Sequence, residues 1–488
     1  MRFPLAGAIL SLLAASVAVA FPSPAPGAPG GTHPVDPARE LFVVDPSVVD
    51  DPLRAAPGGA WHFGTLIARI AGAQDPAVFA ETWLATLIEA PVVNGVAVLE
   101  PGKAADFRAF RDAWRAQGGG PAVDLSLAPF RLCAIVHRPD LVRVDEGGVQ
   151  AYGEARFVYC AVDPASPATT AHTFFVIFEF ELPASGCAEV LSWARAWHSL
   201  GALPLGGEAY NAALESLTDL ATLPDPASGR PNGSRLAQLR TNEFALGANS
   251  NHWNLREWRL RGAPGSQDAA LEPATTRQTP HWSLLKTASG RGVLAEYLDS
   301  ERERILAGTH VVPDVFASAL SGERSFATGN AVNFCGHPRP HTTLPCAAKG
   351  TLWWAPGYQG LPEQPDLTVE DAEVRHRFAL QTCSGCHFFE TGLRLEGLLS
   401  FSMVGARLPG SASPLATFLT GSGGPIADPV APRALDATGN LARVEHRFGD
   451  LARRRGLLER MLALDCAEEA GALLELKSIA ASTGSRVH

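Results

Sequence analysis

Three neighbouring segments with the composition of β-strands constrain the fold of this chain more than any other feature. Residues 129–144, 153–163 and 170–182 read PFRLCAIVHRPDLVRV, GEARFVYCAVD and TAHTFFVIFEFEL, and each is rich in β-branched and aromatic residues. The connections between them are too short for crossover helices, so the strands are expected to pair antiparallel. The N-terminal part of the chain is therefore predicted to contain an antiparallel sheet.

Segments with helical spacing of apolar residues flank these strands. They occupy residues 75–90, 105–117, 186–201, 208–222 and 293–308. Amphipathic helices of this kind usually cover one face of a sheet with their apolar side. The fold class is therefore predicted to be α+β, with one domain over residues 40–320 in which helices cover the sheet.

The first twenty residues have the organisation of a signal peptide. Arg2 precedes an apolar run that ends in Ala-Val-Ala at residues 18–20, an A-x-A cleavage pattern. Cleavage there predicts an exported protein, periplasmic or secreted; an uncleaved anchor helix is the alternative, although the run is short for a membrane span. Residues 21–39 are rich in Pro and Gly and are predicted to be a flexible linker. We expect no membrane span in the mature form, because no later apolar stretch is long enough.

Net charge argues against nucleic acid and anionic lipid as partners, and the expected export places the cysteines in an oxidising compartment. The chain of 488 residues has a formal net charge of −10, which opposes nonspecific binding to nucleic acid or anionic lipid. All eight cysteines lie beyond the cleavage site, in a compartment where disulfides persist. Six would remain for bridges if Cys383 and Cys386 serve another purpose, and their pairing does not follow from one sequence.

The stretch LQTCSGCHFFETG, residues 380–392, carries the strongest chemical signal. Cys383, Cys386 and His387 form C-x-x-C-H, the attachment signature of c-type haem. Two thiols one helical turn apart can form thioethers with the porphyrin, and the adjacent histidine can bind its iron axially. From the composition, only about 0.004 matches to the signature are expected by chance. The sequence therefore predicts one covalent haem c per chain, with His387 as an iron ligand.

Other uses of the motif remain as alternatives: a plain disulfide, a redox-active dithiol or another metal site. The dithiol is disfavoured because thioredoxin-like motifs follow a strand, whereas a helix is expected here. Thr368 and Asp371 form a helix-start pattern before the motif. Residues 441–466 have the strongest helical pattern in the chain. Because this arrangement resembles class I cytochromes c, residues 367–488 are predicted to be a mainly helical, cytochrome c-like region.

The sequence offers two methionines for the opposite side of the iron. Met403 follows His387 by sixteen residues in a loop-like segment and is the first candidate for a metal ligand; packing in a loop or core is the alternative. Met461 lies on the apolar stripe of the last helical pattern and is expected to pack. His376 and His446 lie on predicted helices and are expected to be surface or capping residues.

Residues 321–366 form a second cysteine-containing segment, dense in Gly and Pro and predicted to be a loop or linker. Within it Cys335, His337, His341 and Cys346 place four possible metal ligands within twelve residues. A Cys335–Cys346 disulfide is favoured, because the spacing is not that of a standard zinc knuckle. A tetrahedral zinc site and pairing with other cysteines are the alternatives.

The last helical pattern is locally basic. Arg453, Arg454 and Arg455 follow one another in it. Such a run is usually a solvated helix face. Contact with haem propionates or with an acidic redox partner is the functional alternative.

Several of these segments resemble an uncharacterised family of exported, myxobacterial-type bacterial proteins, and the resemblance covers most of the mature chain. It rests on the strand segments above and on LAQLRTNEFAL, RHRFALQTCSGCHFFETG and LATFLTG. The usual form in that family is T-C-N-G-C-H-x-x-E-T, and Ser384 stands here in place of the asparagine. Many members carry a histidine about where Met403 stands, which implies an exchange of axial ligands. The family implies an exported α+β protein with a cytochrome c-like attachment motif, and no particular activity.

The leading hypothesis is an exported monohaem protein that transfers one electron and docks a redox partner protein through its α+β domain. A disulfide-stabilised binding protein without haem, in which all eight cysteines are structural, is one alternative. A haem peroxidase-like enzyme with an open iron position is the other. Residues 40–320 contain no evident acid–base constellation, and their scattered histidines are expected to pack or to lie at the surface. The sequence does not decide whether the protein is an enzyme.

Overall fold

The structure is a computed structural model that describes most of the chain between residues 33 and 481. The described residues are 33–89, 91–93, 96–97, 101–246, 253–263, 268–275, 296–308, 310, 368–381, 386–387, 390–396, 398–399, 402–428 and 433–481. The predicted signal peptide and Cys383 lie outside the described residues. The same is true of the predicted segment 321–366, with Cys335, His337, His341 and Cys346. Part of the predicted linker is helical, in α1 (Pro37–Glu40).

Seven of the described strands form one antiparallel sheet, as the strand-rich segments predicted. Its order is β1–β4–β7–β8–β9–β10–β11, and every neighbouring pair is antiparallel. The strands are β1 (Phe42–Val43), β4 (Phe130–Arg138), β7 (Gly153–Val162), β8 (Ala171–Leu182), β9 (Leu236–Ala245), β10 (Asn254–Arg261) and β11 (Ala270–Ala274). The three predicted segments thus supply β4, β7 and β8.

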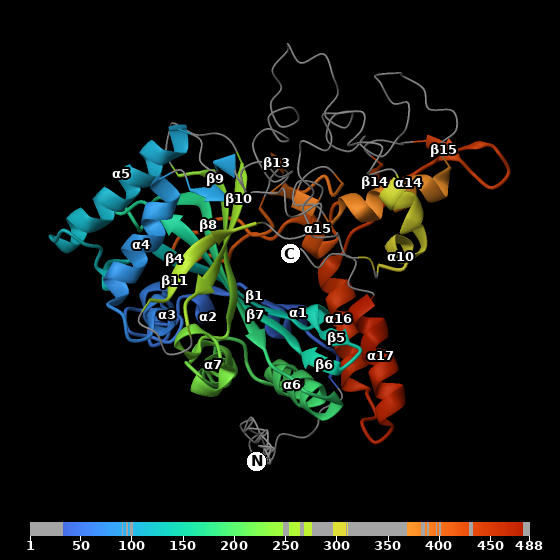
Figure 1. Cartoon of the computed structure of the whole chain (residues 1–488), viewed down its shortest axis with the longest axis horizontal. Coiled ribbons are helices and arrows are strands. Elements are labelled where there is room, and N and C mark those ends of the chain that lie inside the picture. Colours follow the sequence, from blue (N-terminus) through green and yellow to red (C-terminus); the bar gives the residue numbers. More distant parts are fainter. Residues whose placement is uncertain are drawn as a thin grey trace, which may run out of the picture.

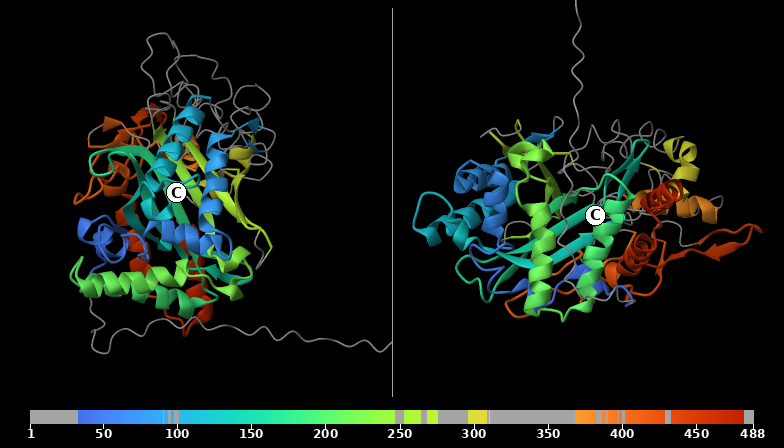
Figure 2. Two further views of the ribbon diagram at one scale, coloured as in Figure 1. Left: turned by 90° about the vertical axis from the view of Figure 1, so that its left-hand side faces the viewer. Right: turned by 90° about the horizontal axis from the view of Figure 1, so that it is seen from below.

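One face of this sheet is apolar because alternate residues of its strands carry large hydrophobic side chains. Phe157 and Tyr159 of β7 and Phe178 and Phe180 of β8 are buried in the main hydrophobic cluster. Helices that pack into the same cluster are α3 (Phe63–Ala71), α4 (Pro76–Ile88), α5 (Pro101–Gly118), α6 (Cys187–Ser199) and α7 (Glu208–Thr222). Figures 1 and 2 show α4 and α5 on one side of the sheet and the C-terminal elements on the other.

The opposite face of the sheet carries two kinds of side chain. Val158 and Phe175 belong to a second, smaller hydrophobic cluster. Farther along the same two strands, Arg156 and Glu179 form an ion pair with 3.2 Å between Nη1 and Oε1. All four residues are buried, so this face also needs a covering layer.

The C-terminal section supplies that layer. Its helices are α14 (Val369–Ala379), α15 (Thr417–Thr420), α16 (Asp450–Leu462) and α17 (Glu469–Ala481). Its short strands are β12 (Arg394–Leu395), β13 (Leu398–Leu399), β14 (Ile426–Ala427), β15 (Arg433–Leu435), β16 (Leu441–Arg443) and β17 (Glu445–His446). As predicted, α14 begins with a reciprocal capping box between Thr368 and Asp371. The boundary of this section and its likeness to a cytochrome c stay predictions.

The predicted long helix over residues 441–466 is wrong in its first part. The helix begins at Asp450, and the residues before it form β16 and β17. A tight turn pairs β15 with β16: Asp436 accepts hydrogen bonds from the backbone of Thr438 and Asn440, and Gly439 adopts a φ of +80°. This turn signal outweighs the helical spacing of the apolar residues, which by itself does not reveal strand pairing.

Helix α16 connects the two layers. Leu457, Leu458 and Met461 pack into the main hydrophobic cluster, which confirms the packing expected for Met461. The first turn of the helix, with Asp450 and Arg453, reaches the second face of the sheet. One helix therefore contributes to the core and to the layer over the opposite face.

Two disulfides join described residues. Cys133–Cys160 links β4 to β7 beneath the second face, with Cα atoms 6.1 Å apart. Cys187–Cys466 ties the start of α6 to the chain after α16, across 279 residues. Among the described residues, no helix is both long and apolar enough to cross a membrane.

Removal of the Cys187–Cys466 disulfide is expected to destabilise the protein by loosening the C-terminal layer. The double substitution Cys187→Ala and Cys466→Ala should lower the free energy of unfolding by about 2–5 kcal/mol, because it frees a long loop in the unfolded chain. Urea unfolding of the oxidised protein measures this loss. Ser216→Ala, on the exposed side of α7, is the control and should change stability by less than about 0.5 kcal/mol. Equal midpoints for the double variant and the wild type would contradict the prediction.

Candidate functional site

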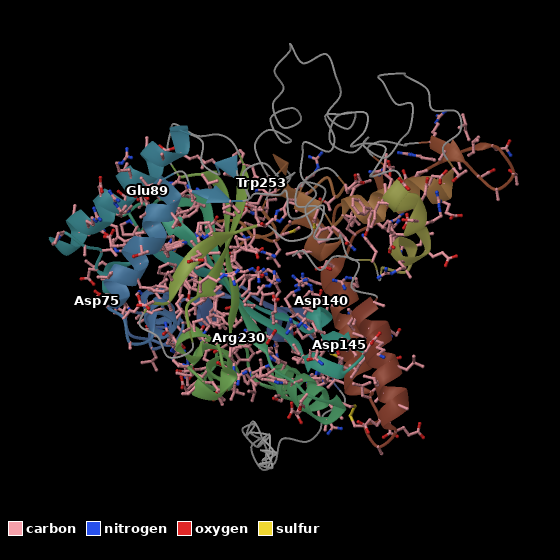
Figure 3. All side chains as sticks on the ribbon, viewed as in Figure 1. Asp75, Glu89, Asp140, Asp145, Arg230 and Trp253 are labelled. Atoms are coloured by element: carbon pink, nitrogen blue, oxygen red, sulfur yellow. A yellow bond between two sulfur atoms is a disulfide. The ribbon has the colours of Figure 1, made fainter. Side chains whose placement is uncertain are left out.

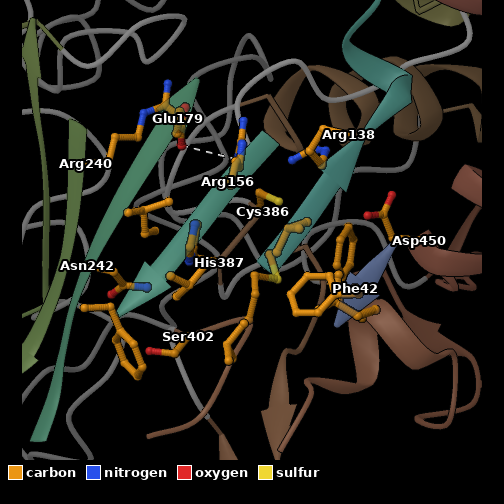
Figure 4. Close-up of a pocket in the computed structure, with 18 of the residues that line it drawn as sticks. Phe42, Arg138, Arg156, Glu179, Arg240, Asn242, Cys386, His387, Ser402 and Asp450 are labelled. Carbon is orange, nitrogen blue, oxygen red and sulfur yellow. Dashed lines mark ion pairs between the residues drawn. The ribbon is translucent and has the colours of Figure 1, made fainter. Parts of the chain in front are cut away.

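The described residues line a partly open cavity between the second face of the sheet and the C-terminal layer. It has about 820 Å³ of empty volume, open solvent included. Its apolar lining comes from both layers: Phe42, Val136, Val158, Phe175, Ile177, Leu255, Val404, Phe418 and Leu419. Figure 4 shows Arg138, Arg156, Glu179 and Arg240 gathered at one end, with Cys386 and His387 beside the strands. The cavity is therefore apolar along its walls and charged at one end.

The C-x-x-C-H motif contributes two residues to the wall of this cavity. Cys386 is 1% and His387 4% exposed, so both lie away from bulk water. The His387 ring packs against the indole of Trp253, with ring centroids 5.2 Å apart. The Trp253 Nε1 donates to Oδ1 of Asn242 at 2.6 Å, which ties this packing to β9. The imidazole is thus held beside the sheet, and residues 383–385 of the motif lie outside the described residues.

Glu390 and Thr391, which follow the motif in the sequence, hold its turn in place. Thr391 donates through Oγ1 to the carbonyl of Cys386 at 2.8 Å. Glu390 accepts from Nη1 and Nη2 of Arg375 at 2.6 and 2.9 Å and from Nδ1 of His376 at 2.7 Å. Burial acts to raise the pKa of Glu390, but Arg375 and His376 outweigh it and hold that pKa below its usual value. The motif is therefore anchored to α14 by a buried ionic group that sequence reasoning did not anticipate.

Met403 reaches the same cavity from a separate segment. Its carbonyl accepts from the amide of Ala416 at 2.9 Å, within a loop braced by an isolated bridge between Val404 and Leu415. Arg407, from the same loop, pairs with Asp50 at 2.6 Å. The structure therefore brings Met403 and His387 to one cavity. Their roles as iron ligands stay predictions.

Buried arginines occupy one end of the cavity wall. Asp140 pairs with Arg138 at 2.8 Å and with Arg453 at 2.9 Å, and Asp450 pairs with Arg454 at 2.5 Å. Figure 3 shows Asp140 beside α16. Three guanidinium groups thus meet two carboxylates, which leaves one positive charge. The expectation of a solvated helix face is wrong for Arg454, which is buried.

The charge state of this group follows from its contacts. Burial acts to raise the pKa of Asp140, but Arg138, Arg454 and Arg453 outweigh it and hold that pKa well below the usual range. Burial and the neighbouring Arg138 lower the pKa of Arg454 to about 10, so this guanidinium stays charged at neutral pH. Among the described residues, Nη1 of Arg453 and Nη1 of Arg454 have no hydrogen-bond acceptor. This end of the cavity is therefore suited to an anion.

The histidines depart from expectation in one place. His376 lies on a helix as predicted, whereas His446 lies on a strand. Both are buried, so the expectation of surface residues is wrong for them. Within residues 40–320, His137 is packed as expected, between the carbonyl of Glu40 and the hydroxyl of Tyr152. Burial lowers the pKa of His137 to about 3, so it stays neutral and acts as a structural hydrogen-bonding group.

The residue types that line the cavity suit the charge and the iron-binding chemistry of a haem group. An imidazole and a thioether, two side chains that bind haem iron, both line the cavity. Arg453 and Arg454 also line it, and each has a buried guanidinium nitrogen without an acceptor among the described residues, which suits a carboxylate.

Comparisons with known proteins do not assign the chain to a family. A scan of protein-family models, a search of curated proteins and a search of solved structures found no match to the chain.

Loss of Arg375 is expected to destabilise the turn that carries the motif. Arg375→Met removes the guanidinium partner of the buried carboxylates Glu390 and Asp428, leaves Glu390 with His376 alone, and should cost about 3–5 kcal/mol of stability. Arg377→Met, two residues later on the same helix, is the matched control. Arg377 forms an exposed ion pair with Glu373, which is worth about 0–1 kcal/mol. Urea unfolding of the two variants measures the difference. Similar losses for both would show that Glu390 does not depend on Arg375.

Proposed function

We propose that the protein is an exported, monohaem c-type cytochrome-like protein that transfers one electron. Cys383 and Cys386 attach one haem, and His387 binds its iron. The observation that carries this proposal is the burial of Cys386 and His387 in the wall of one apolar cavity that Met403 also lines. A C-x-x-C-H pair used only as a surface disulfide would not need such a cavity.

The remaining wall residues have defined roles in this proposal. Met403 would supply a second ligand to the iron, from the loop that Arg407 ties to Asp50. Arg453 and Arg454 neutralise the propionate groups. Haem, when bound, supplies reversible one-electron chemistry, and a Met/His pair favours electron transfer over reaction with small molecules.

The protein surroundings suit that role because they are largely apolar. His387 rests on Trp253, and apolar side chains of β7 and β8 line the same cavity. A buried, apolar setting and a methionine ligand both raise the reduction potential of haem iron. In this proposal the C-terminal region is cytochrome c-like in its attachment motif, while the sheet supplies part of the wall. A redox partner protein exchanges the electron.

Covalent attachment is tested by producing the full chain together with a cytochrome c maturation system. We expect a c-type pyridine haemochrome spectrum with one haem per chain, and its loss in the double variant Cys383→Ala and Cys386→Ala. His387→Ala should also lose it, whereas His172→Ala, a half-buried histidine outside the cavity wall, should keep it. A protein without covalent haem, in which Cys383 and Cys386 are bridged, would overturn the proposal.

The role of Met403 is tested by spin state. Met403→Ala should convert the ferric protein from low spin to high spin, while Met403→His should remain low spin because imidazole replaces the thioether. Met461→Leu is the control: this buried core substitution should cost less than about 1.5 kcal/mol and leave the spectrum unchanged. A high-spin wild type would instead favour a haem peroxidase-like enzyme with an open iron position.

A second candidate function is a disulfide-stabilised binding protein without haem. The observation in its favour is that four of the eight cysteines already form structural bridges. If all eight are structural, the native mass should be lower than the reduced mass by eight protons. Intact mass spectrometry of protein made together with the maturation system separates the two candidates, because covalent haem adds its own mass and uses two of the cysteines.

A further inference from the structure

Two histidines from distant parts of the chain meet next to Glu390, the carboxylate that anchors the motif. His376 lies on α14 and His446 on β17, and their rings stack with centroids 3.3 Å apart and 3° between planes. Asp428, at the end of β14, accepts from Nε2 of His446 at 2.8 Å. One nitrogen of each ring and one carboxylate oxygen of Asp428 lie within 4.8 Å of one another. All three side chains are buried.

Two imidazoles and one carboxylate form a ligand set with defined preferences. Imidazole selects zinc, copper, iron and nickel over calcium and magnesium, which prefer all-oxygen sites. Sites with two histidines and one carboxylate commonly leave further coordination positions open. The side chains would draw together on binding, because tetrahedral ligands at 2.0–2.1 Å from zinc lie about 3.4 Å apart.

An outer layer of residues orients one of the rings. His376 donates through Nδ1 to Glu390 at 2.7 Å, and Arg375 holds Glu390 through both guanidinium nitrogens. A carboxylate that accepts from one nitrogen of a histidine fixes the ring so that its other nitrogen can bind metal. This arrangement of carboxylate and histidine is the usual support of protein metal sites.

The charge of the cluster matches a divalent cation. Asp428 and Glu390 are fully buried, and a carboxylate oxygen of Glu373 lies 3.8 Å from Nδ1 of His446. Arg375 is the buried cation of the group and pairs with Asp428 at 2.5 Å as well as with Glu390. Glu373 and Arg377 are 34% and 44% exposed and pair with each other, where water screens them. The buried group thus carries an excess of one negative charge.

A second cavity gives this cluster an approach route. It has about 1,250 Å³ of empty volume, and His376, His446 and Glu373 line it. Its wall shares four residues with the first cavity, namely Cys386, Phe418, Asp450 and Arg453. The cluster therefore lies next to the proposed haem site and can be reached by an ion and by small ligands.

We infer that His376, His446 and Asp428 bind one first-row divalent transition metal ion, separate from haem iron. Glu390 supports His376 from the outer layer, and the open coordination positions face the second cavity. This site does not depend on haem attachment, so its test is independent of the proposed function.

The full chain, produced without the maturation system so that haem absorption does not mask the Co²⁺ bands, is stripped with a chelator and titrated with Zn²⁺ and with Co²⁺ as a spectroscopic probe. We expect one Zn²⁺ per chain by elemental analysis, counted separately from iron, and an increase in Tm on Zn²⁺ addition. His446→Gln and Asp428→Asn should each abolish the visible Co²⁺ spectrum and the Zn²⁺-dependent increase in Tm. Glu390→Gln should weaken Zn²⁺ binding by about 10–100-fold.

His198→Gln is the matched control. His198 belongs to another group of two histidines and a carboxylate, with His33 and Glu40, and this variant should bind Zn²⁺ as the wild type does. Circular dichroism of the metal-free variants checks that each is folded. The inference is overturned if the wild type binds no Zn²⁺, if His446→Gln binds it unchanged, or if binding is lost in His198→Gln instead.

Discussion

The central constraint on this structure is that both faces of its sheet are buried. Along β7 and β8, alternate side chains point to opposite faces, and large apolar residues occupy both sets. One face is covered by local helices. The other face carries apolar residues at one end and ion pairs such as Arg156–Glu179 at the other. The apolar residues are stable only when a second layer covers them, and the charges beneath that layer must be paired. The C-terminal section is that layer, and the candidate site forms where the two surfaces meet.

The anchor of the motif is the second feature on which the site depends. Arg375, Glu390 and Thr391 hold the turn from behind, so Cys386 and His387 are presented to the cavity rather than to solvent. A buried ion pair of this kind adds little net stability, but it defines one geometry, because breaking it leaves an uncompensated charge. The same anchor orients His376, so one group of residues supports both proposed metal positions.

Several local features could be predicted from the sequence because their causes are local. The antiparallel pairing of β4, β7 and β8 followed from strand composition and short connections. Helices α4 to α7 followed from apolar spacing, and the start of α14 followed from Thr368 and Asp371. The hairpin of β15 and β16 was missed, although its turn signal at Asp436 and Gly439 was present, because helical spacing was given more weight.

Other features could not be predicted because they depend on contacts between residues far apart in the sequence. The partners of Arg453 lie on α16 itself and more than three hundred residues earlier, at Asp140. The pairing of Cys187 with Cys466 spans 279 residues. The close approach of His376 and His446 depends on how α14 packs beside the β14–β17 pair. Burial of a charged side chain in such places is a property of the assembled layers, and no local pattern encodes it.

The sequence by itself determined the residue types and spacing of the motif and the two-sided apolar character of the strands, because both depend on neighbouring residues. The continuous run Phe174–Phe178 of β8 already required two buried faces. Only the tertiary structure decided what covers the second face, and so only it brought His387, Met403 and the buried arginines to one cavity. The physical reason is that side-chain alternation selects the face on which a residue lies, whereas long-range packing selects the partner it meets there.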